Sequence, residues 1–242
     1  MEFAGKSILV TGGSSGIGEQ VATRFAEKGA RVAINSVSSV EAGEDVAARL
    51  GGIYCRADIA DDEATRAMVE EVVSAFGRLD IVVNNAGRTQ VIPHHDLDAV
   101  TDEIWLEILG VNLLGTWHVT RAAVPYLRES DNGSVINVTS LAGLRPVGSS
   151  VPYAVSKAGL NHMTRLLARV LGPEVRVNAV APGLVDTPWT RDWTEIREMV
   201  RKTTPMRSEA MPDDVAEACL FLARSTFVTG DVLAVDGGHQ LI

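Results

Sequence analysis

A tyrosine and a lysine one helical turn apart form the pair in this sequence best suited to proton transfer. Tyr153 and Lys157 are separated by four positions, so on a helix both side chains point from one face. A nearby cation favours a phenolate, and we therefore expect Lys157 to lower the pKa of Tyr153 towards neutral pH, as a general acid or base requires. A Tyr–Lys pair at this spacing is also an ordinary contact on a helix surface, so the neighbouring residues must show whether the pair is functional.

A hydroxyl group follows a nearby apolar strand. The run 134–138 reads SVINV and is followed by Thr139 and Ser140. This order would place a hydroxyl at the carboxyl edge of a parallel sheet, where α/β proteins bind ligands. We expect Tyr153 to exchange a proton with a substrate oxygen and Ser140 to hydrogen-bond that same oxygen. Lys157 would also hold a cofactor ribose, and the hydride chemistry would belong to a nicotinamide.

A glycine-rich segment near the start of the chain could bind the phosphates of such a cofactor. Residues 11–18 read TGGSSGIG and follow the β-branched run 8–10. Glycines allow a tight turn and a close approach of the backbone to a pyrophosphate at a helix N-terminus. Gly12, Gly16 and Gly18 have the spacing GxxxGxG and not that of the GxGxxG fingerprint, so an ordinary glycine-rich βα turn stays open as an alternative.

The ends of the next two expected strands bear on the choice of cofactor. Asn35 and Ser36 stand where an Asp or Glu would bond the ribose 2′-hydroxyl of NAD, and no Arg stands there either. Their amide and hydroxyl donors favour NADP(H) over NAD(H) without settling the choice. Asp58, which precedes Ile59, could accept a hydrogen bond from the adenine amino group, although a turn-initiating aspartate explains it equally well.

Alternating elements would position these residues. Short β-branched runs predict strands at 8–10, 31–35, 53–55, 79–83, 134–138, 176–180 and 232–235, and longer amphipathic stretches predict helices at 16–28, 62–76, 101–127, 152–171 and from Pro212 onwards. This alternation is typical of an α/β fold, a Rossmann-type doubly wound sheet of seven parallel strands with helices on both faces. No linker or repeat divides residues 1–242, so we expect a single domain.

The composition argues against several classes of protein. The net charge of −9 disfavours nucleic acid and anionic membranes as partners. No apolar run approaches the roughly 18 residues that span a bilayer, and the first residues do not resemble a secretory signal. Cys55 and Cys219 suggest neither a disulfide framework nor a metal site. We therefore expect a cytoplasmic chain that acts on a small molecule.

Taken together, the motifs resemble those of the short-chain dehydrogenase/reductase family, and in particular its 3-oxoacyl-[acyl-carrier-protein] reductase-like members. They occur in the family's order: residues 11–18, Asp58, residues 84–87 (NNAG), Asn112, Ser140, Tyr153 with Lys157, Pro182 with Gly183 and Thr187, and residues 235–238 (VDGG). The resemblance implies NAD(P)(H)-dependent interconversion of a secondary alcohol and a ketone. It also implies a homotetramer or a dimer.

The resemblance further implies a role for each matching residue. Asn112 would hold a helix kink whose bound water links Lys157 to solvent, and Thr187 would hold the nicotinamide carboxamide or the phosphates. The catalytic set would be Asn112, Ser140, Tyr153 and Lys157. The cofactor-binding set would be Gly12, Ser14, Ser15, Gly16, Ile17, Gly18, Asn35, Ser36, Asp58, Ile59, Asn85, Ala86, Gly87, Tyr153, Lys157, Pro182, Gly183, Val185 and Thr187.

Two segments, 88–98 and 183–212, are expected to form the substrate cleft, the second as a lid or binding loop. His94 or His95 would bond the substrate, or both are exposed loop histidines. The aromatic and sulfur side chains of the second segment would cover an apolar substrate or pack against the protein's own core. These are Trp189, Trp193 and Met206.

Surface arginines and the catalytic set bear on three competing functions. Four arginines on the two long expected helices would dock an acidic carrier protein or form surface ion pairs: Arg121, Arg128, Arg165 and Arg169. A catalytically silent, cofactor-sensing binding protein would have lost part of the catalytic set, which is complete here. A methyltransferase would have no need of Tyr153 and Lys157 beside Ser140. An enzyme of the oxidoreductase class is therefore favoured.

Overall fold

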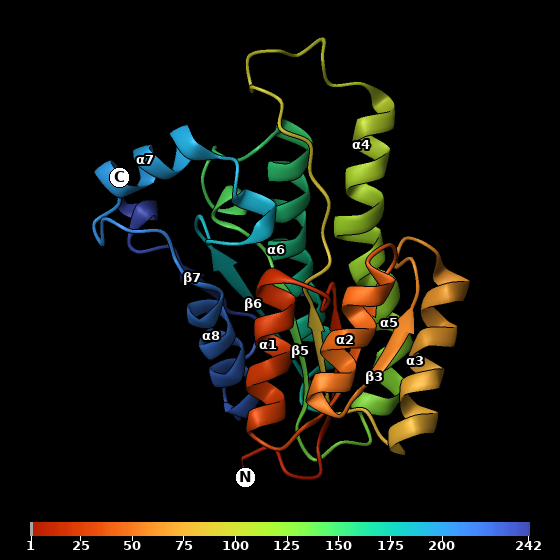
Figure 1. Ribbon diagram of the computed structural model, residues 1–242. Helices are drawn as coiled ribbons and strands as arrows, with labels where there is room; N and C mark the ends of the chain where they lie inside the picture. Colours follow the sequence, from red (N-terminus) through yellow and green to blue (C-terminus); the bar gives the residue numbers. More distant parts are fainter. Residues whose placement is uncertain (1) are drawn as a thin grey trace.

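The computed structural model describes residues 2–242 and contains one seven-stranded parallel sheet (Figure 1). The strands are β1 (Ser7–Thr11), β2 (Arg31–Ser36), β3 (Ile53–Arg56), β4 (Ile81–Asn84), β5 (Gly133–Val138), β6 (Val175–Pro182) and β7 (Val232–Val235). Their order in the sheet is β3-β2-β1-β4-β5-β6-β7. Each predicted strand is present, which confirms the doubly wound fold. The order reverses between β1 and β4, the switch point where such sheets bind ligands.

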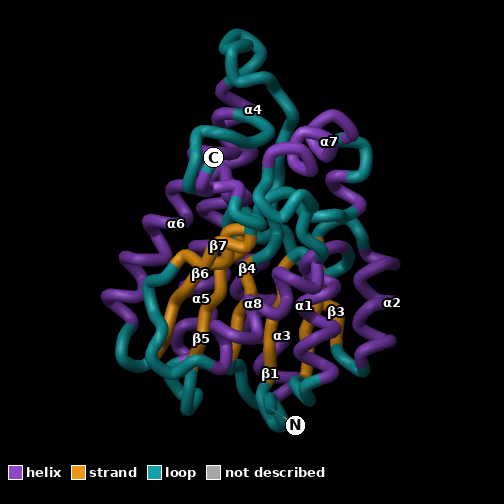
Figure 2. The backbone as a smooth tube through the Cα atoms, turned by 90° about the vertical axis from the view of Figure 1, so that its left-hand side faces the viewer, coloured by secondary structure: helices purple, strands orange, loops and turns teal. Residues whose placement is uncertain are grey.

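Helices cover both faces of the sheet. They are α1 (Gly16–Glu27), α2 (Val40–Leu50), α3 (Asp62–Phe76), α4 (Asp102–Leu109), α5 (Thr116–Leu127), α6 (Val151–Leu171), α7 (Thr194–Thr203) and α8 (Pro212–Arg224). The core on one face includes side chains of α1, α2 and α8, and the core on the other includes those of α3, α5 and α6. Figure 2 shows loops gathered at one end of the strands, with α4 and α7 beyond them and the N-terminal end of the chain opposite.

Strand β1 shows why the strands are so rich in apolar residues. Ile8 and Val10 belong to the core beneath α1, whereas Leu9 belongs to the core on the opposite face. All three side chains are fully buried, and burying one such side chain contributes about 1.5–3 kcal/mol. A sheet that is covered on both faces therefore needs apolar residues at successive positions, not only at alternate ones.

Two helices, α2 and α7, lie in segments for which the sequence predicts none. In α2 the buried residues are Gly43, Val46 and Ala47. Gly43 is required there because the ring of Tyr54 fills the space that a Cβ atom would occupy. In α7 only Val200 is buried. Both helices expose most of their surface, so their apolar positions are too sparse to reveal them by periodicity.

The single helix expected over residues 101–127 is interrupted. A π-helical segment, Gly110–Gly115, separates α4 from α5. Within it the carbonyl oxygen of Asn112 accepts a hydrogen bond from Oγ1 of Thr116 at 3.1 Å, and the Asn112 side chain is fully buried. Single π-helical turns inside α-helices often occur at functional positions, which agrees with the kink expected at Asn112.

Two features are absent from the described chain. Across residues 2–242, no helix combines the length and the apolar character needed to cross a membrane. The same residues contain no group of three or more His, Cys, Asp or Glu side chains that could hold a metal ion.

Candidate active site

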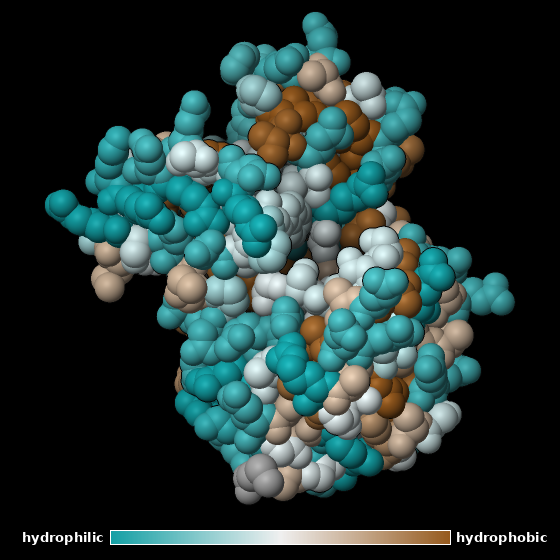
Figure 3. All heavy atoms as spheres, in the orientation of Figure 1, coloured by the Kyte–Doolittle hydropathy of each residue, from teal (hydrophilic) through white to brown (hydrophobic). Residues whose placement is uncertain are grey.

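A cleft of about 800 Å³ opens at the carboxyl ends of the strands. It begins at the glycine-rich segment after β1, crosses the end of β4 and reaches Tyr153 on α6 and the inner side of α7. Figure 3 shows this face of the molecule hollowed between the part that carries α7 and the body below it. Both expected substrate segments, 88–98 and 183–212, contribute lining residues.

The glycine-rich segment forms a turn that only glycine fits. Gly12 and Gly16 have φ angles of +62° and +56°, in the left-handed region. A Cβ at Gly12 would lie 2.9 Å from the Cα of Ala86, and one at Gly18 would collide with the carbonyl oxygen of Gly12. Ser15, the N-cap of α1, makes no side-chain cap bond. The turn therefore leaves backbone space and free donors at a helix N-terminus, which fits the phosphates of a dinucleotide.

Asn85 fastens this turn to the neighbouring strand. Its Nδ2 donates to the carbonyl oxygens of Thr11 at 3.1 Å and Gly12 at 3.0 Å. In return, Oγ1 of Thr11 accepts hydrogen bonds from the backbone nitrogens of Asn85 and Ala86, both at 3.1 Å. Asn85, Ala86 and Gly87 line the cleft as expected, but the Asn85 amide supports the glycine turn from the end of β4.

The donors expected to hold a ribose phosphate are used within the protein. Nδ2 of Asn35 donates to the carbonyl oxygens of Cys55 at 3.1 Å and Ala57 at 3.0 Å, and the side chain is buried. The hydroxyl of Ser36 lies 3.1 Å from the Ser39 carbonyl oxygen and 2.9 Å from the Tyr54 hydroxyl. Both hydrogens of the Asn35 amide are therefore bonded within the protein, one to β3 and one to Ala57 just after it, although Asn35 does line the cleft.

Asp58 begins a turn after β3. Its Oδ1 accepts a hydrogen bond from the backbone nitrogen of Ala60 at 2.9 Å, as in a turn-initiating aspartate. Asp58 is exposed and does not line the cleft, whereas Ala57 and Ile59 on either side of it do. The turn uses Oδ1 alone, so a hydrogen bond from the adenine amino group to this carboxylate stays a prediction.

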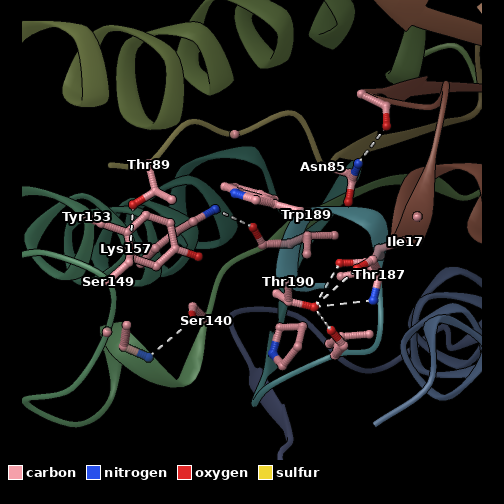
Figure 4. Close-up of a pocket in the computed structure, with 18 of the residues that line it drawn as sticks. Ile17, Asn85, Thr89, Ser140, Ser149, Tyr153, Lys157, Thr187, Trp189 and Thr190 are labelled. Carbon is pink, nitrogen blue, oxygen red and sulfur yellow. Dashed lines mark hydrogen bonds between the residues drawn. The ribbon is translucent and has the colours of Figure 1, made fainter. Parts of the chain in front are cut away.

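Tyr153 and Lys157 lie on one face of α6, as their spacing predicts. Lys157 is 4% exposed, and its Nζ donates to the carbonyl oxygen of Val138 at 2.9 Å. The same Nζ lies 5.7 Å from the centre of the Tyr153 ring. Figure 4 shows the lysine chain beside that ring, with Trp189 nearby. Burial lowers the pKa of Lys157 to about 8, because the ammonium loses its hydration.

The direction expected for the tyrosine pKa is wrong. Burial raises the pKa of Tyr153, and a hydrogen bond with Ser140 acts in the opposite direction with a smaller effect. The Lys157 ammonium does not reverse this, because it faces the ring and donates to Val138 rather than to the phenol oxygen. Ser140 also accepts a hydrogen bond from the backbone nitrogen of Ala142 at 3.1 Å, which holds its hydroxyl at the end of β5.

Asn112 ties three segments together. Its Oδ1 accepts from the backbone nitrogen of Arg88 at 2.7 Å, and its Nδ2 donates to the Arg88 carbonyl oxygen at 3.0 Å and to Oγ of Ser156 at 2.9 Å. Gly87 leaves a gap beside it, since a Cβ there would lie 3.5 Å from Asn112 Oδ1 and 3.7 Å from Lys157 Nζ. The structure thus brings Asn112 to the far side of a small opening next to Lys157.

The segment after β6 closes the other side of the cleft. Its lining residues include Pro182, Gly183, Val185 and Thr187, all of which the sequence singles out. Thr187 faces the glycine turn, because a Cβ at Gly16 would lie 3.4 Å from the Thr187 side chain. Oγ1 of Thr190 bonds the carbonyl oxygen of Val185 at 2.5 Å and accepts from the Thr187 backbone nitrogen at 3.3 Å, which fixes this bend.

Helix α7, which we call the lid helix, and the turn before it supply the apolar wall of the cleft. Trp189 and Trp193 line the cleft, as expected, but Met206 is 71% exposed and lies instead against Gly237. Three residues of α7 that the sequence analysis missed also line it: Ile196, Met199 and Val200. Their i, i+3, i+4 spacing puts them on one face of α7, but it spans little more than one turn and is too short to identify a helix from the sequence.

Ion pairs hold the lid helix from outside the cleft. Arg197 pairs with Glu209 at 2.9 Å and with Asp186 at 2.7 Å, and Arg201 pairs with Glu209 at 2.7 Å. The Arg201 guanidinium holds the pKa of the Glu209 carboxyl below its ordinary value. α7 is therefore held by these ion pairs on its outer side and, on its buried face, by Val200 alone.

The open alternatives for histidines and arginines are partly decided. His94 and His95 are both exposed, and of the two only His94 lines the cleft. Arg121 forms a surface ion pair with Asp62 at 2.5 Å, as one alternative predicts. In residues 2–242 no ion pair joins the other three arginines of that group, which are exposed: Arg128, Arg165 and Arg169.

Comparison with known proteins decides the family. A family model described as Enoyl-(Acyl carrier protein) reductase matches residues 12–240. A Streptomyces violaceoruber protein named "Granaticin polyketide synthase putative ketoacyl reductase 2" is 57% identical over 238 residues, which cover 97% of this chain and 96% of that protein. The chain belongs to the short-chain dehydrogenase/reductase family.

Solved structures of the short-chain dehydrogenase/reductase family have the same fold. The 3-ketoacyl-(acyl-carrier-protein) reductase of Brucella melitensis, complexed with NADH, is 35% identical with a TM-score of 0.92 over 98% of this chain and 99% of that one. A short chain dehydrogenase of Burkholderia cenocepacia, in complex with NADP, is 34% identical with a TM-score of 0.91 over 99% of each chain. This chain is thus an NAD(P)-dependent oxidoreductase that interconverts a ketone and an alcohol, and nothing supports a catalytically silent alternative.

Proposed function

We propose that this short-chain dehydrogenase/reductase reduces the ketone of an acyl chain, with NADPH as the reductant and Tyr153 as the proton donor. The joint placement of Tyr153, Ser140 and Lys157 in the lining of the cleft carries the proposal, because a phenol is protonated at neutral pH and can give that proton to a substrate oxygen beside it. The similarity to a protein named as a ketoacyl reductase supports an acyl substrate. The apolar wall formed by Trp189, Ile196 and Met199 suits such a chain.

The cleft has the features that a nicotinamide dinucleotide needs. Gly12, Ser15 and Ile17 would hold its phosphates at the N-terminus of α1, and Thr187 would hold its nicotinamide end. When bound, the nicotinamide supplies the hydride that reaches the carbonyl carbon. A preference for NADP(H) is supported by the lack of any acidic side chain among the lining residues at the end of β2, since a carboxylate there would repel a 2′-phosphate.

The side chains of this protein would handle the proton and the charge. Tyr153 would give its proton to the carbonyl oxygen, while the hydroxyl of Ser140 donates a hydrogen bond to that oxygen as negative charge develops. Lys157, with a pKa of about 8, carries a positive charge at pH 7 and would hold a ribose hydroxyl of the cofactor. The opening beside Gly87 would admit a water between Lys157 and Asn112, through which the phenol regains its proton from solvent.

Segments 88–98 and 183–212 would select the substrate. The hydroxyls of Thr89 and Ser149 lie 2.5 Å apart next to Tyr153 (Figure 4) and line the cleft. They would offer a polar contact close to the reacting carbonyl, while the lid contacts the apolar chain. His94 would lie near the entrance.

We further propose that the protein is a cytoplasmic homotetramer or dimer. Several large apolar side chains on α4, α5, α6 and the π-helical segment are exposed in the single chain: Leu106, Leu114, Trp117, Val155, Leu166 and Val170. Contact with a second copy would remove them from water. Sedimentation at several protein concentrations tests this, and a monomer at every concentration would refute it.

Steady-state kinetics of purified protein test the reaction. We expect acetoacetyl-CoA to oxidise NADPH, and Tyr153→Phe to lower kcat by about 10²–10⁴-fold with little change in cofactor binding. Tyr126→Phe is the matched control, because Tyr126 lies on α5 away from the lining residues and packs against the core. Undiminished turnover in Tyr153→Phe would refute the proposed proton donor. Failure to reduce any 3-oxoacyl thioester, with reduction of other ketones intact, would refute the substrate class alone.

A further inference from the structure

The end of β2 receives an arginine from the neighbouring strand. β2 and β3 pair in parallel with Ser36 opposite Arg56, so the last residues of both strands lie side by side. Nε of Arg56 donates to the carbonyl oxygen of Val37 at 3.2 Å. β3 is the edge strand of the sheet, next to α2 (Figure 1). The guanidinium is therefore fixed at the start of the β2–α2 connection, although no arginine occurs in that connection itself.

The Arg56 guanidinium has N–H groups that make no hydrogen bond to a side chain or backbone oxygen of the described chain. Arg56 is exposed, and in the part of the chain that the structure describes no carboxylate pairs with it. The bond to Val37 uses Nε and leaves both terminal nitrogens of the fork, the groups that bind phosphate oxygens best.

The cleft extends to the end of β2 and the connection that follows it. Its lining residues include Ser36, Val37, Ser38 and Ser39, the last of which is the N-cap of α2 and makes no side-chain cap bond. Ser38 and Ser39 are exposed, whereas the Asn35 amide and the Ser36 hydroxyl are already bonded within the protein. The polar side chains that remain for a ligand at this end of the cleft are thus the hydroxyls of Ser38 and Ser39. The Arg56 guanidinium does not line the cleft itself but is bonded to the lining residue Val37, at its rim.

We propose that Arg56, assisted by the hydroxyls of Ser38 and Ser39, binds the 2′-phosphate of NADP(H) and sets the cofactor preference. The inference rests on the proposed use of NADPH and names the residue responsible for it. A 2′-phosphate is the part of NADP(H) that NAD(H) lacks, so a cation here discriminates between the two cofactors without touching the reacting groups. Arg56 is thereby a specificity residue supplied by β3, not by the β2 end.

Cofactor binding to the full-length protein tests the proposal. We expect Arg56→Gln to raise the Kd of NADPH about tenfold and to leave that of NADH within about twofold, because only the phosphate contact is lost. Arg56→Lys should recover part of the loss. Arg31→Gln is the matched control: it removes the same charge from an exposed position at the opposite end of β2. It should change neither Kd.

The outcomes separate the two proposals. Wild-type protein that prefers NADPH, with the preference retained in Arg56→Gln, would refute the role of Arg56 and leave the use of NADPH standing. Wild-type protein that binds NADH at least as tightly as NADPH would refute both. Equal weakening of NADPH and NADH in Arg56→Gln would also overturn the proposal, since it would mean that Arg56 maintains the shape of the strand end rather than contacting the phosphate.

Discussion

Replacing Lys157 by methionine should make the free protein more stable while removing its activity. Lys157 is 4% exposed, and its pKa falls from an ordinary value of 10.5 to about 8. Each tenfold change in an equilibrium corresponds to about 1.4 kcal/mol, so keeping the buried side chain charged costs the folded state about 3 kcal/mol. Lys157→Met removes this cost but loses the charge-assisted bond to the Val138 carbonyl oxygen, worth about 2 kcal/mol. We expect a net gain of about 1 kcal/mol at pH 7.

The pH dependence makes this prediction specific to the buried charge. Below pH 8 both the folded and the unfolded chain carry the ammonium, and the folded chain bears the full cost. Between about pH 8 and 10.5 the folded chain has released the proton while the unfolded chain retains it, so the stability of the wild type rises with pH. The stability of Lys157→Met relative to the wild type should therefore fall by about 2 kcal/mol between pH 7 and about pH 9.5.

Urea unfolding followed by tryptophan fluorescence measures the difference, at one fixed protein concentration because assembly affects stability. Lys202→Met is the control, since Lys202 is exposed on α7 and should change stability by less than about 0.5 kcal/mol at either pH. A Lys157→Met protein that is less stable than the wild type at pH 7 would contradict the reasoning. So would an advantage that stays constant as the pH rises.

Three further substitutions test other parts of the site. Gly18→Ala should abolish binding of NADPH in a fluorescence titration, because its Cβ would collide with the carbonyl oxygen of Gly12 and lie 2.5 Å from Nδ2 of Asn85. Gly110→Ala is the control and should bind NADPH normally, because no atom lies within 4 Å of its Cβ. Asn112→Ala should lower the free energy of unfolding by about 2–3 kcal/mol, since it removes three hydrogen bonds of a fully buried side chain, and a loss below about 0.5 kcal/mol in urea would contradict this. Trp189→Ala should raise the KM of a long-chain 3-oxoacyl thioester more than that of a short one, and an equal rise for both would show that the indole does not contact the chain.

The sheet could be predicted from the sequence because its strands are buried on both faces. Near-continuous apolar runs such as Ile8 to Val10 have no other place in a folded chain of this size. The spacing of Tyr153 and Lys157 likewise placed both on one face of α6. By contrast, α2 and α7 bury so few residues that their sequences resemble loops.

Properties that depend on neighbouring segments could not be predicted in this way. The direction of the Tyr153 pKa follows from burial and from where the Lys157 ammonium points, and neither is visible in a spacing of four. Asn35 stands at the expected strand end, yet β3 uses its amide. Arg56 reaches the same strand end only through parallel pairing, so a search along the β2 segment does not find it.

The attachment of α7 suggests how this protein could acquire new substrates. The glycine turn is fastened to β4 by several hydrogen bonds, whereas the lid helix buries one side chain and is otherwise held by ion pairs at its rim. Substitutions in residues 194–203 that spare Val200, Arg197 and Arg201 can therefore alter the wall of the cleft without disturbing the core or the cofactor end. Variation in this lid can accumulate at little risk to folding, and directed evolution of substrate range should begin there.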